Sequence, residues 1–204
     1  MKKQQKMQNL IVIHSTKNTI LKIGTFNLAN SLLDEKSETT NFFLREKEII
    51  STIDKMNPDI LALNELRPYS DHNTKEIYYP SNFLGKIKEY DHFYDYINGS
   101  ALAFGIGLIY KRSSVYPIKT IKHWLSNTPT IPSDSWGNGF GRIIMGVKFL
   151  PIDNGKIIIN TEPIWVFVTH LGLGEKEKNE CVNLIPKLIK KEVENDHYVI
   201  MGHI

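Results

Sequence analysis

The chain has 204 residues, of which 41% are hydrophobic and 23% are charged, values expected for a single folded domain with a sizeable core. The formal net charge is +3. Lys2, Lys3 and Lys6 account for all of this charge, so the rest of the chain is close to neutral. Binding of nucleic acid by charge alone needs a cluster of basic residues, and the composition argues against a module of that kind.

The single cysteine, Cys181, excludes an internal disulfide framework and suits a reducing compartment. It falls in a helical pattern, where we expect a buried and unreactive thiol. The lysine-rich start is followed by a short apolar run, Leu10 to Ile13, which is too short for the core of a signal peptide. No apolar run approaches the roughly 20 residues that span a membrane. We therefore expect a cytoplasmic or otherwise intracellular protein.

In chain order, we expect a flexible N-terminal tail over residues 1–18 and one domain over residues 19–204. Two helices are predicted, at Asn41–Met56 and at Glu175–Glu194, the second interrupted or restarted at Pro186. Strands are predicted at Ile20–Asn27, Ile60–Leu66, Phe93–Ile97, Gly105–Lys111, Val115–Trp124, Arg142–Leu150, Ile164–His170 and His197–Met201.

This order of elements predicts an α+β fold in which two β-sheets pack face to face as a sandwich flanked by helices, a four-layer α/β/β/α arrangement. The last predicted strand lies within a few residues of the end of the sequence. Domains usually finish at an exposed surface element rather than directly after a core strand. We therefore expect the fold to be incomplete at its C-terminus.

Glu65 is the most informative polar residue, because it follows the apolar run Ile60–Leu63 at the end of a predicted buried strand. An unpaired carboxylate in that position is unfavourable. It is therefore expected to be exposed, to bind a metal ion, or to pair with Arg45, Arg67 or Arg142. Carboxylate oxygens suit Mg²⁺ or Mn²⁺.

Asn27 and His170 also end predicted strands, where a rigid backbone can aim a side chain into a cleft. Asn27 either orients a carboxylate, contacts a phosphate, or ends its strand in a turn. His170 either contacts a phosphate, transfers a proton, or is a hydrogen-bonded structural histidine. Arg142 either holds a phosphate with two hydrogen bonds or pairs with Glu65.

Taken in order, several segments resemble the motifs of the endonuclease/exonuclease/phosphatase superfamily, which includes deoxyribonucleases, neutral sphingomyelinases and inositol polyphosphate phosphatases. The matching segments are Gly24–Leu28, Asn57–Glu65, the glycine-led strand Gly105–Lys111, the Trp-Leu-Ser segment at 124–126 with Pro129, Trp136 and Arg142, and the Thr-His-Leu segment at 169–171. The resemblance implies the four-layer sandwich of that superfamily and extends over nearly the whole chain.

By this resemblance, Glu65 would bind the divalent metal, Mg²⁺ or Mn²⁺, and Asn27 beside it would act as a ligand or hold the phosphate. His170 and Arg142 would contact the substrate and neutralise charge in the transition state. Tyr110, in the glycine-led strand, would also bind substrate. The substrate would be a phosphate ester, and the resemblance leaves open a nucleic acid, a phospholipid or an inositol phosphate.

The resemblance is broken near the end of the sequence. Tyr198–Gly202 leads toward the Gly-Asp-Phe-Asn motif of the superfamily, but His203 follows Gly202, and no Ser-Asp-His motif is present. Two hypotheses follow: a metal-dependent phosphoesterase, or a truncated, non-catalytic remnant that acts at most as a binding module. A sandwich without its last strands exposes sheet edges, so we also expect self-association through those edges.

Overall fold

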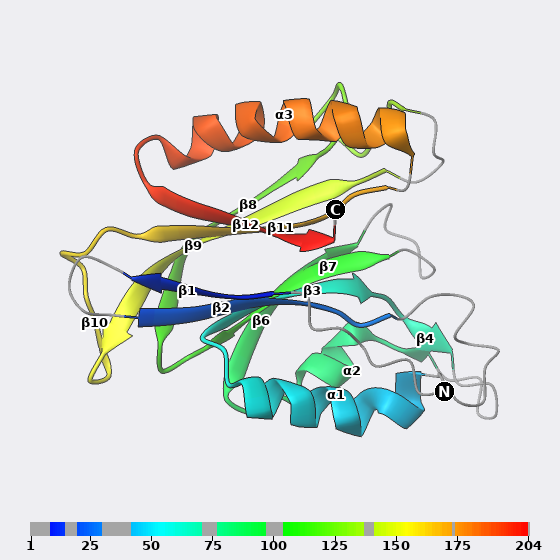
Figure 1. Cartoon of the computed structure of the whole chain (residues 1–204). Coiled ribbons are helices and arrows are strands. Elements are labelled where there is room, and N and C mark those ends of the chain that lie inside the picture. Colours follow the sequence, from blue (N-terminus) through cyan, green and yellow to red (C-terminus); the bar gives the residue numbers. More distant parts are fainter. Residues whose placement is uncertain are drawn as a thin grey trace.

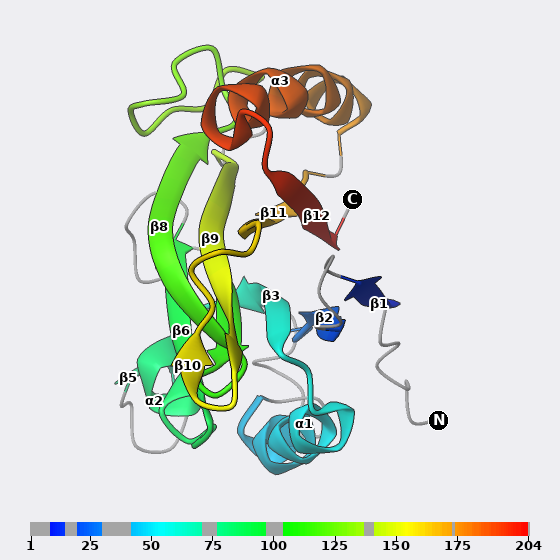
Figure 2. The ribbon, with the colours of Figure 1, turned by 90° about the vertical axis from the view of Figure 1, so that its left-hand side faces the viewer.

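The computed structural model describes residues 9–14, 20–29, 42–70, 77–96, 104–136, 141–172 and 174–203. Two β-sheets lie face to face in the middle of the molecule, with α1 and α2 on one outer side and α3 on the other (Figure 1). The view turned by 90° shows α3 and α1 on opposite outer sides of the sheets (Figure 2). The predicted α+β sandwich of four-layer α/β/β/α type is therefore confirmed.

The first sheet has the strand order β1-β2-β3-β7-β6. Its strands are β1 (Asn9–His14), β2 (Ile20–Asn27), β3 (Ile60–Leu66), β7 (Gly105–Lys111) and β6 (Tyr90–Tyr96). β2 and β3 are parallel, whereas the other neighbours are antiparallel. The crossover between β2 and β3 contains α1 (Phe42–Met56), as a parallel pair requires a long connection. β2 and β3 therefore end at the same edge of the sheet.

The strand β1 corrects part of the tail expected over residues 1–18. Asn9–His14 pair with β2 in antiparallel register, from Asn9 opposite Thr25 to His14 opposite Ile20. The apolar run Leu10–Ile13, in which three of the four residues are β-branched, suits a strand. The rest of the expected tail lies outside the described residues.

The second sheet has the order β10-β9-β11-β12, with β8 on the other side of β9. Its strands are β8 (Val115–Trp124), β9 (Ile143–Asp153), β10 (Lys156–Ile157), β11 (Ile164–His170) and β12 (His197–His203). β11 and β12 are parallel and are connected through α3 (Glu175–Val193). The short elements β4 (Tyr69–Ser70), β5 (Ile77–Tyr78) and α2 (Pro80–Leu84) lie between β3 and β6 in the chain.

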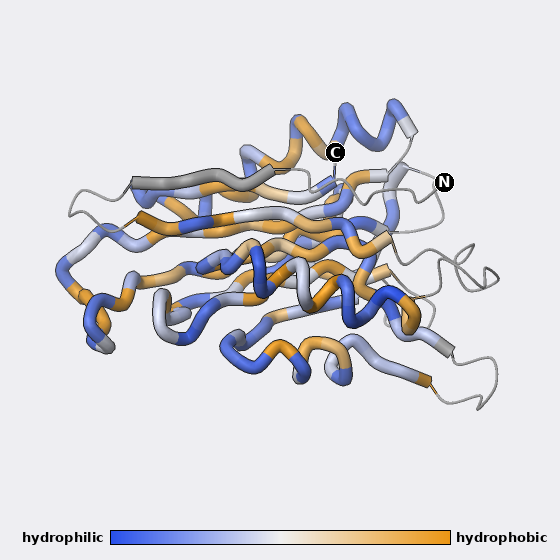
Figure 3. Tube along the Cα trace, turned by 60° about the horizontal axis from the view of Figure 1, so that its bottom comes forward, coloured by the Kyte–Doolittle hydropathy of each residue, from blue (hydrophilic) through white to orange (hydrophobic). Residues whose placement is uncertain are grey.

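Three buried clusters correspond to the three interfaces between layers. The cluster between the sheets includes Leu21, Ile23, Ile60, Ala62, Leu108, Val147, Val166, Val168 and Met201. A second cluster joins the first sheet to α1, and a third joins the second sheet to α3. Hydrophobic residues are concentrated along the strands, whereas the helices alternate between hydrophobic and hydrophilic faces (Figure 3). Because side chains alternate along a strand, these clusters fix which face each strand residue occupies.

The helix α3 is continuous through Pro186, so the predicted interruption is not found. A proline inside a helix costs about 3 kcal/mol relative to alanine. The opposing contribution is burial of an apolar face, since Cys181, Ile185 and Leu188 pack in the cluster beneath the helix. The strand bounds differ from those predicted by two or three residues in three places: β6 begins at Tyr90, β9 extends to Asp153 and β12 extends to His203. None of the helices in the described ranges has the length and apolar character of a membrane span.

Candidate active site

The C-terminal ends of β2, β3, β11 and β12 lie at one end of the sandwich. The arrowheads of β3 and β12 point the same way in Figure 1. A buried hydrogen bond of 2.9 Å from Asn64 Nδ2, near the end of β3, to the main-chain oxygen of Thr169, near the end of β11, links the two sheets there. This is the edge where the sequence predicts a site.

Four polar residues at these strand ends share the face between the sheets. They are Asn27, Asn64, His170 and His203. Each follows a residue of the cluster between the sheets by two or four positions along its strand, and so points to the same face. These cluster residues are, in the same order, Ile23, Ala62, Val168 and Met201. The alternation of the strands therefore gathers amide and imidazole groups at one end of the sandwich.

Glu65 joins this group through a β-bulge. Its φ angle is 61°, and the register of β3 against β7 shifts between Asn64 and Leu66. Asn27 Nδ2 donates a hydrogen bond of 2.8 Å to Glu65 Oε1, and Asn27 Oδ1 accepts one of 2.8 Å from the backbone N–H of Ala29. Without the bulge, alternation after Asn64 would point the carboxylate toward α1. The bulge therefore brings the half-buried carboxylate to Asn27.

The ion pairs that the sequence offers for Glu65 are not formed within the part of the chain that the structure describes. Arg45 donates instead to the main-chain oxygen of Leu28 at 2.9 Å, and no ion pair joins Glu65 to Arg67 or Arg142. One carboxylate with a partly exposed environment fits Mg²⁺ or Mn²⁺, because Mg²⁺ keeps several waters and takes one or two protein carboxylates. No cluster of three or more His, Cys, Asp or Glu residues suited to a metal ion occurs in the described ranges.

His170 is mostly buried at the end of β11. Burial, followed by the positive charges of Arg142 and His203, lowers its pKa to about 4, so the imidazole is neutral at pH 7. The rings of His170 and His203 are 5.3 Å apart between centroids and are inclined by 73°. Nδ1 of His170 is buried and has no hydrogen-bond partner among the described residues.

Arg142 is held by α3 rather than by Glu65. Its Nε lies 3.5 Å from Oε1 of Glu177, in the first turn of the helix, and its Nη1 lies 3.5 Å from the main-chain oxygen of His170. A Cβ atom added to Gly172 would lie 1.4 Å from Oε2 of Glu177, so the carboxylate needs a glycine there. Sequence reasoning missed Glu177. The available signal was an acidic residue four positions before Cys181 on the apolar stripe of the helix.

The structure does not bring Tyr110 to the other predicted site residues. Tyr110 pairs with Ile60, at the start of β3, whereas Gly105 lies opposite Leu66 at its end. The five-residue separation along β7 corresponds to about 17 Å. The ring is buried and stacks on Phe93 with centroids 5.6 Å apart. Tyr110 is therefore a core residue at the far end of the sandwich.

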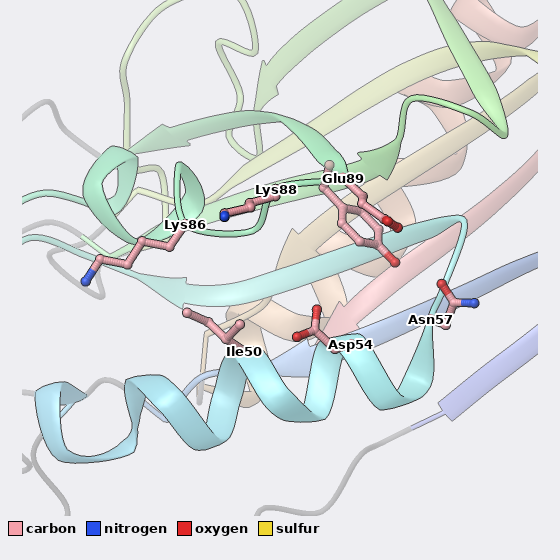
Figure 4. A pocket seen from close by; sticks show the side chains of 7 residues that line it. Ile50, Asp54, Asn57, Lys86, Lys88 and Glu89 are labelled. Atoms are coloured by element: carbon pink, nitrogen blue, oxygen red, sulfur yellow. The ribbon is translucent and has the colours of Figure 1, made fainter.

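A separate pocket lies near the N-terminal end of β3, away from Glu65. Its volume is about 480 Å³, and it is lined by Ile50, Asp54, Asn57, Lys86, Lys88, Glu89 and Tyr90. The side chains come from α1, from the segments that precede β3 and β6, and from the first residue of β6 (Figure 4). Charges of both signs line it, and it is not part of the site described above.

No family model matches the chain. A curated relative, uncharacterized protein L388 of Acanthamoeba polyphaga mimivirus, is 29% identical over 162 residues, which cover 78% of this chain and 56% of the relative. The chain thus spans little more than half of the length of that relative.

Several solved structures resemble the chain. An endonuclease/exonuclease/phosphatase from Bacteroides vulgatus has a TM-score of 0.72 at 21% identity, covering 89% of this chain and 64% of that one. A mannosyl-6-phosphatase, Bt3783, from Bacteroides thetaiotaomicron has a TM-score of 0.71 at 19% identity, with coverage of 89% and 64%. ANGEL2, a 2′,3′-cyclic phosphatase, has a TM-score of 0.62 at 16% identity, with coverage of 97% and 56%.

These identities are low, so the likeness to the solved structures establishes the fold and nothing finer. The chain covers less than two thirds of each of the three solved chains. Its two face-to-face sheets and outer helices agree with the resemblance found in the order of the motifs. The chain has the fold of the endonuclease/exonuclease/phosphatase superfamily.

Proposed function

We propose that the chain carries a site for the hydrolysis of phosphate esters that depends on Mg²⁺ or Mn²⁺ and is centred on Glu65. The observation that supports this proposal is the 2.8 Å hydrogen bond from Asn27 to Glu65. It holds a half-buried carboxylate at the end of the sandwich where His170 also lies. Among proteins of the same fold, one is a mannosyl-6-phosphatase and another is a 2′,3′-cyclic phosphatase.

In this proposal, Glu65 holds the cation through the carboxylate oxygen that does not accept from Asn27. A cation bound there would polarise a phosphoryl oxygen. Both polar ends of the Asn27 side chain already have partners, so its main role is to orient the carboxylate rather than to coordinate the ion. A carboxylate that is fixed before substrate arrives needs little reorganisation during the reaction.

His170 is the proposed phosphate contact, because a neutral imidazole can donate one N–H to a phosphoryl oxygen. Arg142 acts on this group indirectly: its guanidinium lies against Glu177 and the carbonyl oxygen of His170. It therefore contributes positive potential and fixes the end of β11, in place of the two-hydrogen-bond phosphate contact that the sequence suggested. Tyr110 has no part in the proposed site.

The test is hydrolysis of bis(p-nitrophenyl) phosphate and p-nitrophenyl phosphate by the 204-residue chain with Mg²⁺, Mn²⁺ or EDTA. The expected result is release of p-nitrophenolate that requires the metal and is abolished by Glu65→Ala. Glu89→Ala is the matched control, since this carboxylate is exposed and lies by the distant pocket. Turnover that persists in EDTA, or in the Glu65→Ala variant, would overturn the proposal.

A second candidate is a phosphate-binding module without turnover. The observation that favours it is His203, which stands where the resemblance leads one to expect a carboxylate. Imidazole is a weaker ligand than carboxylate for a hard cation. Calorimetric titration of the chain with inorganic phosphate in the presence of Mn²⁺ separates the two candidates. Binding without hydrolysis supports the module, and the absence of both excludes each candidate.

A further inference from the structure

Two histidines on neighbouring strands face each other at the end of the second sheet. His170 of β11 and His203 of β12 are direct partners in the parallel register, so their side chains leave the sheet on the same side. The ring centroids are 5.3 Å apart. The backbone N–H of Leu171 donates to the main-chain oxygen of His203 at 3.0 Å, which fixes the two strands where the rings meet.

The hydrogen bonding of His170 is incomplete. Its Nδ1 is buried without a partner in the described part of the chain, although buried polar atoms in folded proteins nearly always have one. Such an atom calls for an explanation, and an ion or water bound beside it is a common one. The imidazole of His203, whose ring centroid lies 5.3 Å from that of His170, is the neighbouring side chain that could supply a second nitrogen ligand.

We propose that His170 and His203 form a second divalent-cation site, which prefers Zn²⁺ and Co²⁺ to Mg²⁺. Imidazole nitrogen suits zinc, copper, nickel and iron, whereas magnesium takes oxygen ligands. With Zn–N bonds of roughly 2.0–2.1 Å, two imidazoles on one tetrahedral ion have ring centroids on the order of 5 Å apart. The observed 5.3 Å agrees with this spacing. Water or phosphate oxygens would complete the coordination.

This cation site is separate from the cation site on Glu65, although His170 takes part in both proposals. The carboxylate of Glu65 does not form a three-residue metal cluster with the two histidines within the described ranges. The proposal therefore does not require the hydrolytic function, and it goes beyond that function by assigning a different class of cation to different ligands. Two protein ligands imply an ion that exchanges readily rather than a permanent structural zinc.

The positive charge of Arg142 opposes cation binding, because its Nη1 lies 3.5 Å from the main-chain oxygen of His170. Glu177, 3.5 Å from Arg142 Nε and almost fully buried, offsets that charge. The balance favours a metal held through nitrogen lone pairs over one attracted by charge alone. This is a further reason to expect selectivity against Mg²⁺.

The test is titration of EDTA-stripped chain with Co²⁺, followed by the visible absorption of the bound ion and repeated in excess Mg²⁺. One equivalent is expected to bind and to resist Mg²⁺. His203→Gln and His170→Gln should each weaken binding by roughly tenfold or more. His197→Gln is the matched control, because this exposed histidine of the same strand pairs with Glu162 and should leave the titration unchanged. Absence of Co²⁺ binding, or binding unaffected by His203→Gln, would overturn the proposal.

Two further variants separate this proposal from the hydrolytic one. Glu65→Gln should remove Mg²⁺- or Mn²⁺-dependent hydrolysis and leave Co²⁺ binding intact. If Glu65→Gln removes Co²⁺ binding as well, only one site exists and the second site is excluded. His203→Asp replaces a nitrogen ligand with an oxygen ligand and should shift preference from Co²⁺ toward Mn²⁺. Circular dichroism of each variant verifies that it is folded, and an unchanged Co²⁺/Mn²⁺ preference in folded His203→Asp would contradict the assignment.

Discussion

The side-chain amide of Asn64 donates a buried hydrogen bond of 2.9 Å to the main-chain oxygen of Thr169 and so joins the two sheets. Thr169 Oγ1 in turn donates to the main-chain oxygen of Ile143 at 3.0 Å. These two bonds connect β3, β11 and β9 beside Glu65 and His170. They help to set the separation of the sheets where the candidate site lies.

Asn64→Leu keeps the approximate size of the side chain and removes its donor without adding a charge. The oxygen of Thr169 would then be buried without its partner, and we expect the free energy of unfolding to fall by about 2 kcal/mol. Urea denaturation monitored by tryptophan fluorescence measures this loss. Asn82→Ala is the control, because Asn82 is an exposed cap that accepts from the backbone N–H of Tyr79 and should cost less. Equal losses of unfolding free energy in the two variants would show that the hydrogen bond between the sheets contributes no more than the exposed one.

Gly202→Ala should destabilise the fold strongly. Gly202 has a φ angle of 139°, and an added Cβ would lie 1.8 Å from the main-chain oxygen of Thr169. We expect a loss of about 3 kcal/mol or more, since backbone must move on both strands. Gly155→Ala provides the comparison: its φ is 73°, but nothing lies within 4 Å of the added atom, so only conformational strain of about 1 kcal/mol applies. Thermal unfolding that ranks the two variants the other way would refute the contact.

The Arg142–Glu177 pair should behave as a coupled unit. Both side chains are largely buried, and removal of one takes the opposite charge away from the other, at a cost of about 3 kcal/mol. We expect Glu177→Gln and Arg142→Met each to destabilise the fold and the double variant to lose less than the sum of the two. A double-mutant cycle in urea gives the coupling energy. Simple additivity would mean that the 3.5 Å approach contributes nothing.

The pH dependence of stability should carry a component from His170. Burial and the charges of Arg142 and His203 lower its pKa from 6.5 to about 4. Between these values the unfolded chain binds a proton that the folded chain does not, so this contribution is complete above about pH 6.5 and is lost as the pH falls toward 4. The loss is on the order of 3 kcal/mol.

Metal-free chain and its His170→Gln variant, unfolded in urea at several pH values with EDTA, isolate that component. The wild-type chain should lose more stability than the variant between neutral pH and pH 4.5. Histidines that do not interact with His170 are common to both proteins and cancel in the difference. Parallel curves would show that His170 titrates normally in the folded state.

The strands that position the candidate site were predictable because each is a short apolar run with a polar residue at its end. The apolar run Ile60–Leu63 before Glu65 can be recognised from neighbouring residues alone, and so can the apolar run before His170. The convergence of Asn27 with Glu65 was also anticipated from the order of the motifs. The pattern could not predict which charged residues form ion pairs, because Glu177 reaches Arg142 only after α3 packs on the second sheet.

Other differences also arise from tertiary structure. Pro186 is a local signal for a helix end, but α3 has enough buried apolar contact to continue through it. Tyr110 belongs to a matching glycine-led strand, yet the antiparallel register of β7 places it at the far end from Glu65. Register depends on both strands of a pair, so the sequence of one strand alone predicts it only weakly.

The left-handed residue at position 65 interrupts an otherwise regular ladder between β3 and β7. A chain shortened by that single residue would place Leu66 directly after Asn64 and close the ladder, and the strand would then be smoother and free of an unfavourable backbone angle. Such a deletion is therefore expected to give a protein that is as stable as the natural one, or more so, while its strand end has lost the acidic group. Glu65 thus lowers the stability of the fold while it supplies the carboxylate of the proposed site. Selection for stability alone would tend to remove this residue.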